Sequence, residues 1–490
     1  MINKKFLIPF SIAILSIILS FLLYPYYLSD DAFIHIGFIN GLLKGDGFSF
    51  AGNRTYGTTS PLWVILGSGF SFVTRDPELS IRILSGFFTF LSISFFYFLI
   101  SKLKLSEAVK IIVLLSLAIN PFVLRWSLTG MEATAAMFLM IVFIILFQKE
   151  QSLKIQIYTG ILFGISYLLR PEFGGFFLLT ILYIIIKKKS DRKNLIFIIP
   201  AVLIISAWLI FSYFHFGTIL PNTYTAKSST QLLIFDIRTF FRDMQTLFIV
   251  NLPDFIFSGI LILLIVFIHK RGRKELFLTI SDKFKDLNMI VFILWISTFY
   301  IFYILRDVTI VSRYEIIFIP LIIFLVAIVF ENLLNFKTKR FFTFLKSAYV
   351  FLIIFSSAIL TFNVIKPSVD DFVNGFQSTY KHIAQIINSN SKVQDVSVGV
   401  ADVGIIGADS NAKVYDSVGL VDNERFKYKS TLEYYLDKKP DFIILREEEN
   451  IIDVIPVNVG YKILFSKKLP GFGIKEQEAR TVTLYKINWK

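Results

Sequence analysis

The stretch that decides the fold is FLIPFSIAILSIILSFLL (residues 6–23), followed at once by YPYYLSDDAFIHIGF (residues 24–38). The first part carries no charged side chain over nearly the length of about 20 residues that a transmembrane helix needs. The second part places two adjacent aspartates, Asp30 and Asp31, just beyond it. No small-x-small cleavage pattern lies between the two parts, so the run is predicted to be an uncleaved membrane anchor rather than a signal peptide.

Similar apolar runs recur along the chain. Of its 490 residues, 55% are hydrophobic and 18% are charged, and the mean hydropathy is +0.67. Soluble proteins carry about 25% charged residues, so this composition indicates a polytopic membrane protein. The sequence predicts an all-α bundle of about 11 transmembrane helices, near residues 6–24, 82–101, 107–124, 131–147, 155–170, 172–186, 195–214, 254–268, 289–305, 314–331 and 347–364.

The net charge of +14 does not indicate a nucleic-acid partner, because the excess basic residues gather on one side of these runs. Lys187 to Lys189 and Lys270 to Lys274 fall in loops of the same side. The positive-inside bias makes that side cytoplasmic. We therefore expect a protein of the cytoplasmic (inner) membrane, with the N-terminus inside and, after an odd number of spans, the C-terminal region outside.

The chain changes character after residue 365. Residues 1–365 are predicted to form the transmembrane module, and residues 366–490 an extracytoplasmic soluble α/β domain. Short apolar runs of strand length there (396–400, 442–445, 461–466 and 481–487) alternate with helical stretches near 370–389 and 424–437. The first outer loop, residues 25–81, is expected to hold an interfacial helix over 31–44 and a second short helix opening at Ser60-Pro61.

Polar residues at the outer ends of the spans are the candidates for chemistry, because such groups are costly at membrane depth. These are Asp30, Asp31, Arg125, Glu132, Arg170, Glu172, Lys227, Arg306, Arg313 and Glu315. Carboxylates and cations that converge in one outer cavity suit a reaction in which a carboxylate removes a hydroxyl proton and cations stabilise a departing phosphate.

Simpler roles remain open for each of them. Asp30 and Asp31 are equally well read as a helix cap with a solvated first-turn acid. Arg170 and Glu172 lie in LLRPEF (168–173), a tight reversal where a charged pair is expected in any case. His35 lies one helical turn after Asp31, and an i,i+4 pair with that carboxylate is its simplest role.

Cysteine is absent, which excludes disulfides and thiolate ligands, and the four histidines have no metal-ligand spacing. No cofactor or metal is therefore predicted. The adjacent carboxylates of Asp30 and Asp31 still leave a divalent metal open.

Six motifs in register together resemble a known family. They are DDAFIHIGFINGLLKGDGFSF with YGTTSPLW, LTGMEAT, LLRPEF, FGTILPNTYTAK, SRYEIIFIP, and ADVGIIG with VYDSVGLVDN. The chain from about residue 28 to residue 423 resembles GT-C glycosyltransferases that use polyprenyl-phosphate sugars, and it is most similar to the terminal arabinofuranosyltransferase-like subgroup of cell-envelope polysaccharide biosynthesis.

This resemblance implies an outward-facing cavity, a lipid-linked sugar donor and catalytic roles for Asp30 and Asp31. Glu132 matches the family's Gly-Leu/Met-Glu motif, Arg170 and Glu172 match its Arg-Pro-Glu/Asp-like turn, and Lys227 and Arg313 match positions whose charge suits the donor phosphate. From charge and membrane side, we assign donor phosphate binding to Arg54, Arg170, Lys227 and Arg313. On the same grounds, we assign supporting or acceptor-binding roles to His35, Glu132, Glu172 and Asn222. One departure stands out: the family's pattern has an arginine where this chain has Gly37, so that Arg54, Lys44 or His35 would have to supply the cation.

The function predicted is transfer of a hexosyl or pentosyl group from a polyprenyl-phosphate donor to a hydroxyl of an extracytoplasmic glycan or glycolipid. Partners are then the membrane lipid, the donor and the acceptor, with no nucleic acid. A transporter or flippase of lipid-linked sugars, and a polysaccharide polymerase or ligase, remain alternatives at this stage.

Overall fold

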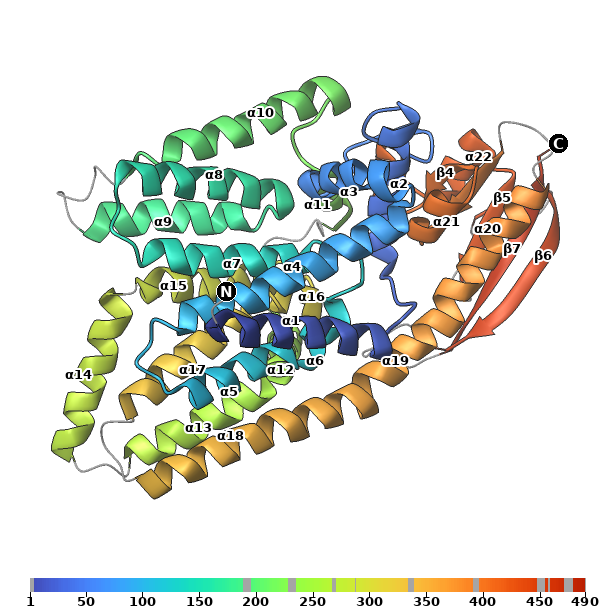
Figure 1. Ribbon diagram of the computed structural model, residues 1–490. Helices are drawn as coiled ribbons and strands as arrows, with labels where there is room; N and C mark the ends of the chain where they lie inside the picture. The colour runs from blue at the N-terminus through green and yellow to red at the C-terminus, as the bar shows by residue number, and fades with distance from the viewer. Residues whose placement is uncertain are drawn as a thin grey trace.

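The computed structural model describes residues 4–187, 195–227, 235–266, 270–286, 288–333, 339–390, 396–446, 454–456, 459–470 and 479–489. Long helices run side by side through most of the molecule, and a five-stranded sheet lies at one end (Figure 1).

Every predicted transmembrane segment falls on one or two helices. These are α1 (Lys4–Leu23), α4 (Pro77–Ile100), α5 (Glu107–Ala118), α6 (Pro121–Trp126), α7 (Ala133–Phe147), α8 (Leu153–Leu169), α9 (Phe173–Lys187), α10 (Ile198–Phe216), α13 (Leu252–Val266), α15 (Met289–Leu305), α17 (Ile319–Leu333) and α18 (Lys339–Leu360). The break between α5 and α6 lies at Asn120, whose side chain caps α6 by accepting hydrogen bonds from the backbone N–H groups of Phe122 and Val123. Four shorter or amphipathic helices connect this set: α11 (Asn222–Lys227), α12 (Ile237–Val250), α14 (Lys270–Asp286) and α16 (Ser312–Glu315).

Fewer helices than eleven meet a strict test of length and hydropathy for membrane spans. Within the described residues, three helices pass (Pro77–Ile100, Ile198–Phe216 and Phe342–Asn390), and five do if two sharply bent pairs, α12 with α13 and α14 with α15, each count as one span. The other apolar helices have 10–17 residues. The chain is a multi-pass membrane protein, and the count of eleven stays a prediction.

The last long helix continues past the predicted domain boundary at residue 365. After α18 the chain passes through a π-helical segment, η3 (Thr361–Ile365), then α19 (Lys366–Asp371), a second π-helical segment η4 (Phe372–Gln377) and α20 (Ser378–Asn390) without a break. Pro367 lacks an N–H donor, and the π-helical turn just before it accommodates that loss. This helix joins the bundle to the sheet (Figure 1).

The C-terminal sheet contains the four predicted strands and one that was not predicted. Its order is β4-β3-β5-β7-β6, with β3 (Ser397–Val400) parallel to β4 (Lys413–Asp416) and β5 (Phe442–Arg446), and β7 (Arg480–Asn488) antiparallel to β5 and β6 (Gly460–Leu469). The helices α20, α21 (Val403–Asp409) and α22 (Thr431–Lys438) accompany it. A mixed α/β unit is therefore present, as the sequence predicts.

The first outer loop forms the two predicted helices, α2 (Asp30–Lys44) and α3 (Pro61–Thr74), with Pro61 at the start of the latter. Between them lies a small hairpin of β1 (Ser49–Phe50) and β2 (Asn53–Arg54), whose turn residues Ala51 and Gly52 both have positive φ. The side-chain amide of Asn53 donates to the backbone oxygen of Val414 at 2.6 Å. The first loop is thus attached to the edge strand β4.

Helix α2 packs closely on α21 through small residues. A Cβ added at Gly404 would lie 2.4 Å from the backbone oxygen of Asp30, and one at Gly407 would lie 2.2 Å from the Phe50 ring. The Asn40 side chain donates to the backbone oxygen of Ala408 at 3.2 Å. These contacts fix the start of α2 against the C-terminal unit.

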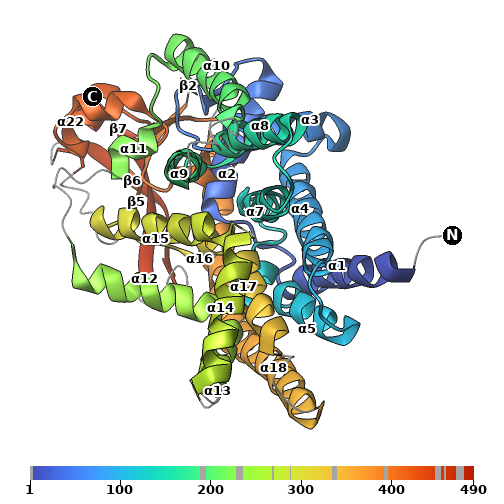
Figure 2. The same ribbon diagram turned by 90° about the vertical axis from the view of Figure 1, so that its left-hand side faces the viewer.

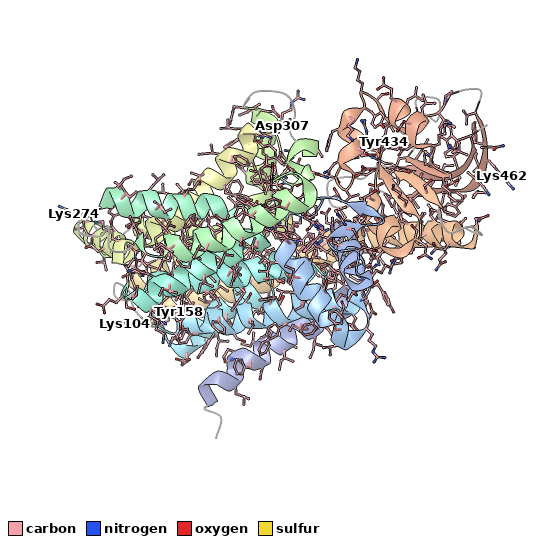
Figure 3. All side chains as sticks on the ribbon, turned by 90° about the horizontal axis from the view of Figure 1, so that it is seen from above. Lys104, Tyr158, Lys274, Asp307, Tyr434 and Lys462 are labelled. Carbon is pink, nitrogen blue, oxygen red and sulfur yellow. The ribbon has the colours of Figure 1, made fainter. Side chains whose placement is uncertain are left out.

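The basic residues predicted to be cytoplasmic lie far from the sheet. Lys104 and Lys274 are at one end of the molecule, and Tyr434 and Lys462 of the C-terminal unit are at the other (Figure 3). This separation fits the predicted orientation, which itself stays a prediction.

Candidate functional site

A cavity of about 650 Å³ is lined by residues of α2, α9, α15 and α16, among others. These four helices lie close together in the view of Figure 2. Of the ten residues given a catalytic, phosphate-binding or supporting role from the sequence, six line the cavity: Asp31, His35, Glu132, Arg170, Glu172 and Arg313. They come from four segments that are far apart in the chain, and the structure brings them together here.

Asp31 faces the cavity and pairs with Arg313 of α16 through Oδ2 and Nη1. The Asp31 side chain is 41% exposed, whereas that of Arg313 is 15% exposed. A carboxylate that is held by an arginine and still open to the cavity can accept a proton from a ligand hydroxyl. The i,i+4 pair of His35 with Asp31 is not formed.

Asp30 faces away from the cavity and contacts the C-terminal unit. Its side chain lies against Gly404, and its Oδ1 atom is buried without a hydrogen-bond partner in the described part of the chain. Burial, and secondarily the nearby carboxylate of Asp402, raise the pKa of Asp30 to about 7. Ser29, not Asp30, occupies the N-cap position of α2, and its side chain makes no capping hydrogen bond.

A buried charged network lies beside Asp31. His35 Nε2 is 3.2 Å from Glu132 Oε2, and Arg170 Nε donates to Glu132 Oε1 at 3.1 Å. Glu132 is the N-cap residue of α7 and Arg170 follows the last residue of α8, so the ends of two helices are joined through this carboxylate. The Tyr303 hydroxyl of α15 donates to Glu172 Oε1 at 2.9 Å.

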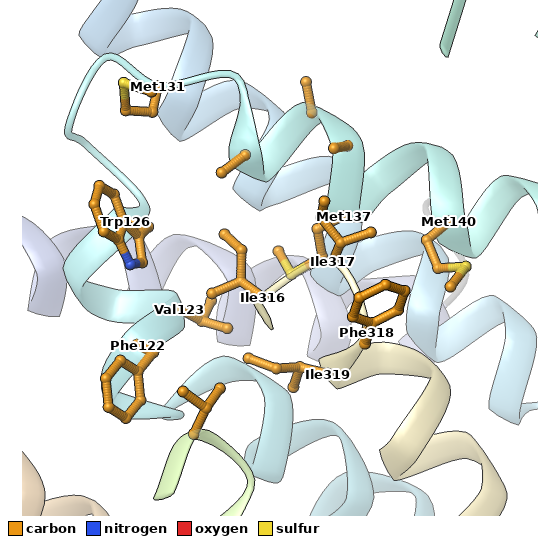
Figure 4. Packing of buried hydrophobic residues seen from close by; sticks show 14 of the residues in the cluster. Phe122, Val123, Trp126, Met131, Met137, Met140, Ile316, Ile317, Phe318 and Ile319 are labelled. Carbon is orange, nitrogen blue, oxygen red and sulfur yellow. The ribbon is translucent and has the colours of Figure 1, made fainter. Parts of the chain in front are cut away.

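Arg313 is positioned by the apolar packing behind it. Ile316 to Ile319 lie among Phe122, Val123 and Trp126 of α6 and Met137 of α7 (Figure 4). The Trp126 indole N–H donates to Ser312 Oγ at 3.0 Å, one residue before Arg313. The Tyr314 ring then lies between two cations, 4.5 Å from the Arg170 guanidinium and 5.2 Å from that of Arg313.

Some N–H groups of the arginines at the cavity have no hydrogen-bond partner among the described residues. Arg170 Nη1 and Arg313 Nε are buried and have no hydrogen-bond partner in the described ranges. Arg306, at the C-terminal end of α15, lines the cavity and contacts the Tyr224 ring at 5.4 Å, without an ion pair to any described residue. Buried donors normally find a partner, so an anionic ligand group fits here.

One wall of the cavity is apolar and open. Leu178, Leu182 and Phe302 line it and are each more than half exposed. They belong to α9 and α15, which pack on each other. Asp31 and the arginines lie at the polar part of the same cavity.

The remaining predicted residues lie elsewhere. Arg54 is exposed in β2 and does not line the cavity. Asn222 is buried, and its side-chain amide donates to Thr55 Oγ1 at 2.7 Å, between the cavity-lining residues Pro221 and Thr223. Lys227 ends α11, and its side chain lies outside the described residues.

An arginine at position 37 would not fit this structure. A Cβ on Gly37 would lie 2.4 Å from the Phe50 ring. Of the three predicted substitutes for that cation, His35 lines the cavity, whereas Lys44 and Arg54 do not.

Sequence reasoning did not assign several residues of the cavity. Arg306 was noted as a span-end cation but was given no role, and Thr58, Thr59, Ser60 and Leu420 were not selected. Hydroxyl and leucine side chains give no signal in a single sequence, because such residues are common in any loop. Among the described residues, no group of three or more His, Asp or Glu side chains is arranged to hold a metal ion.

Comparison with solved structures identifies the fold. ArnT from Cupriavidus metallidurans, in a structure bound to undecaprenyl phosphate, matches with a TM-score of 0.63 and 10% sequence identity, over 99% of this chain and 98% of that one. Its apo structure matches with a TM-score of 0.61, 9% identity, and 96% and 97% coverage. The chain has the GT-C fold. An oligosaccharyltransferase from Archaeoglobus fulgidus, in a complex with Zn and sulfate, shares this GT-C fold with a TM-score of 0.53 and 12% identity, over 88% of this chain and 67% of that one.

Sequence comparison is less informative for this chain. Residues 372–485 match the sequence model of a domain of unknown function (DUF8728). No curated protein matches the chain. The predicted arabinofuranosyltransferase-like subgroup is therefore not confirmed.

Proposed function

We propose that this protein is a membrane glycosyltransferase that moves a pentosyl or hexosyl group from a polyprenyl-phosphate donor to a hydroxyl of an extracytoplasmic glycan or glycolipid. The observation that carries this proposal is the single cavity in which the Asp31–Arg313 pair and unsatisfied arginine N–H groups meet an open apolar wall. ArnT, which has the same fold, has been solved with undecaprenyl phosphate bound.

The apolar wall suits the donor's prenyl chain. Leu178, Leu182 and Phe302 would contact the lipid chain from α9 and α15 while the phosphate lies at the polar part of the cavity. Arg306 is the cation best placed for the phosphate, because it has no ion pair to any described residue, whereas Arg170 is paired with Glu132 and Arg313 with Asp31. This division of the cavity supports a lipid-linked donor.

Asp31 is the proposed general base. Its carboxylate accepts the proton of the acceptor hydroxyl while the hydroxyl oxygen forms a bond to the anomeric carbon of the donor sugar. The bond between that carbon and the phosphate oxygen breaks, and polyprenyl phosphate leaves with the electron pair. The arginines stabilise the negative charge that develops on the leaving phosphate. Glu132, Glu172 and His35 hold the surrounding helix ends in place.

The matched pair Asp31→Asn and Asp30→Asn tests this assignment. The two carboxylates are adjacent in the chain, but Asp31 lines the cavity and Asp30 lies against Gly404. Purified protein in lipid is incubated with labelled polyprenyl-phosphate pentose and hexose and a panel of glycan acceptors. We expect Asp31→Asn to lower the transfer rate by about 10²–10⁴-fold and Asp30→Asn to stay within about tenfold of the wild type. Unchanged transfer in Asp31→Asn would refute the role of Asp31. Movement of the lipid across vesicles with no transfer from any donor would support a flippase instead.

A further inference from the structure

The part of the cavity nearest the C-terminal unit is built from three chain segments. It is lined by residues 57–60 of the first loop, by Pro221 and Thr223 at the start of α11, and by Leu420 of the C-terminal unit. A Cβ at Gly57 would lie 2.8 Å from the backbone oxygen of Leu420, so these two segments are in direct contact. The C-terminal unit therefore contributes to the cavity wall.

Hydrogen bonds hold the three segments together. The Asn222 side-chain amide donates to Thr55 Oγ1 at 2.7 Å, and the Thr55 hydroxyl donates in turn to Asn423 Oδ1 at 2.8 Å. The backbone N–H of Asn222 donates to the backbone oxygen of Tyr56 at 2.9 Å. All three donors and acceptors lie just outside the cavity-lining residues, so they fix the wall without filling the space.

The loop that carries Leu420 is fixed from within. The carboxylate of Asp416, which is fully buried, accepts hydrogen bonds from the N–H groups of Val418 at 2.8 Å and Val421 at 2.9 Å. Gly419 has a φ of +86°, and a Cβ there would lie 2.7 Å from the Phe426 ring. Asp416 thus has a structural role, and the loop presents Leu420 in one orientation.

The chemistry of this wall is polar but uncharged. Residues 55–60, 221–224 and 417–421 include no acidic or basic residue. Thr59 and Thr223 are half-buried and line the cavity, and within the described chain their hydroxyls make no hydrogen bond. A sugar ring carries hydroxyl groups at its edge and C–H groups on its faces. The free hydroxyls can hydrogen-bond the first, and the leucine side chain can contact the second.

We propose that this wall is the acceptor subsite and that it binds an uncharged sugar, with Thr59, Thr223 and Leu420 as its contact residues. This inference rests on the proposed function, in which the acceptor must reach Asp31 in the same cavity. Thr59, Thr223 and Leu420 carry no charge, and the nearby cation Arg306, which contacts the Tyr224 ring, is occupied by the donor phosphate in that function. The carboxylate of an acidic sugar would therefore lose its hydration at this wall without compensation. The subsite therefore disfavours anionic acceptors.

The test compares matched acceptors with the full-length protein. Octyl glycosides of several neutral sugars are assayed beside the octyl glycosides of the corresponding uronic acids, with one polyprenyl-phosphate sugar as donor. Transfer of the donor sugar to water is measured in parallel without acceptor. Thr59→Val removes one hydroxyl at nearly constant shape, Leu420→Ser removes the apolar contact, and Val418→Ala is a control in the same loop that does not line the cavity.

We expect a neutral acceptor to be preferred over its uronic acid. Loss of one hydrogen bond in Thr59→Val should raise the acceptor KM by about five- to tenfold. Val418→Ala should behave as the wild type, also in the rate of transfer to water. Three results would overturn the subsite and leave the proposed function intact. They are a preference for the uronic acids, failure of every neutral acceptor while the donor sugar is still transferred to water, and an unchanged acceptor KM in both Thr59→Val and Leu420→Ser. Absence of any donor turnover would overturn both.

Discussion

The buried pair of Glu132 and Arg170 offers the sharpest test of how the cavity is held together. The two side chains are 3% and 5% exposed, and Arg170 Nε donates to Glu132 Oε1 at 3.1 Å. With charge centres about 4 Å apart, an effective dielectric constant near 20 gives an attraction of about 4 kcal/mol. Glu132→Gln keeps the shape but removes the carboxylate that Arg170 hydrogen-bonds, and leaves Glu172 as the remaining acidic group that acts on Arg170. We therefore expect it to lower the free energy of unfolding by about 3–5 kcal/mol, as is typical of a broken buried pair.

The measurement is a double-mutant cycle in mixed lipid–detergent micelles, with unfolding by SDS followed through tryptophan fluorescence. Glu132→Gln, Arg170→Met and the double variant are compared, and the double variant should be more stable than the sum of the single effects implies by about 2–4 kcal/mol. Asp370→Asn is the control, because its ion pair with Lys366 is 36–48% exposed and should contribute less than about 1 kcal/mol. A coupling energy between Glu132 and Arg170 below about 1 kcal/mol, which is the loss expected for the exposed pair of the control, would refute the reasoning.

Three further predictions concern single residues. Because burial and Asp402 raise the pKa of Asp30 to about 7, the folded protein binds a proton that the unfolded chain loses near pH 4. The free energy of unfolding should therefore fall as the pH rises from about 4 to 7. In Asp30→Asn, the difference in Tm between pH 5 and pH 8 should be smaller than in the wild type. An unchanged difference would contradict this. Gly37→Arg should destabilise the protein by about 1–3 kcal/mol rather than add a useful cation, because its Cβ would meet the Phe50 ring; thermal unfolding measures this, and a wild-type Tm would show that the ring yields. Arg306→Gln should raise the donor KM by about tenfold with little change in the acceptor KM, and steady-state kinetics with an equal rise in both would exclude a specific contact with the donor.

Much of the fold could be predicted because apolar runs and strand-length runs are strong local signals. The elements that were missed lack such a signal. Strand β4 is the four-residue KVYD, which carries two charges, and it is a strand because β3 pairs with it along its whole length. The hairpin of β1 and β2 has strands of two residues each. Both are defined by contacts between segments far apart in the chain, which one sequence does not reveal.

The site was predictable where charge and membrane side determined it. Asp31, Glu132, Arg170, Glu172 and Arg313 are charged residues at the predicted outer span ends, and the fold brings them to one cavity. For His35, sequence spacing favoured a partner on the same helix. The structure instead pairs it with Glu132 of another helix end, because α2 lies across the end of α7 and a tertiary partner is within reach.

The two adjacent aspartates show why such a pair cannot be resolved from sequence alone. On a helix, successive side chains point about 100° apart, so Asp30 and Asp31 at the start of α2 must face different surroundings. Which surroundings each one meets is decided by residues more than 250 positions away: Gly404 of α21 contacts Asp30, and Arg313 of α16 pairs with Asp31. The same close packing that removes Asp30 from the cavity holds the first turn of α2 in place, and it thereby directs Asp31 toward the cavity. In the proposed reaction, the C-terminal unit thus acts in two ways, through the orientation of Asp31 and through the wall at Leu420.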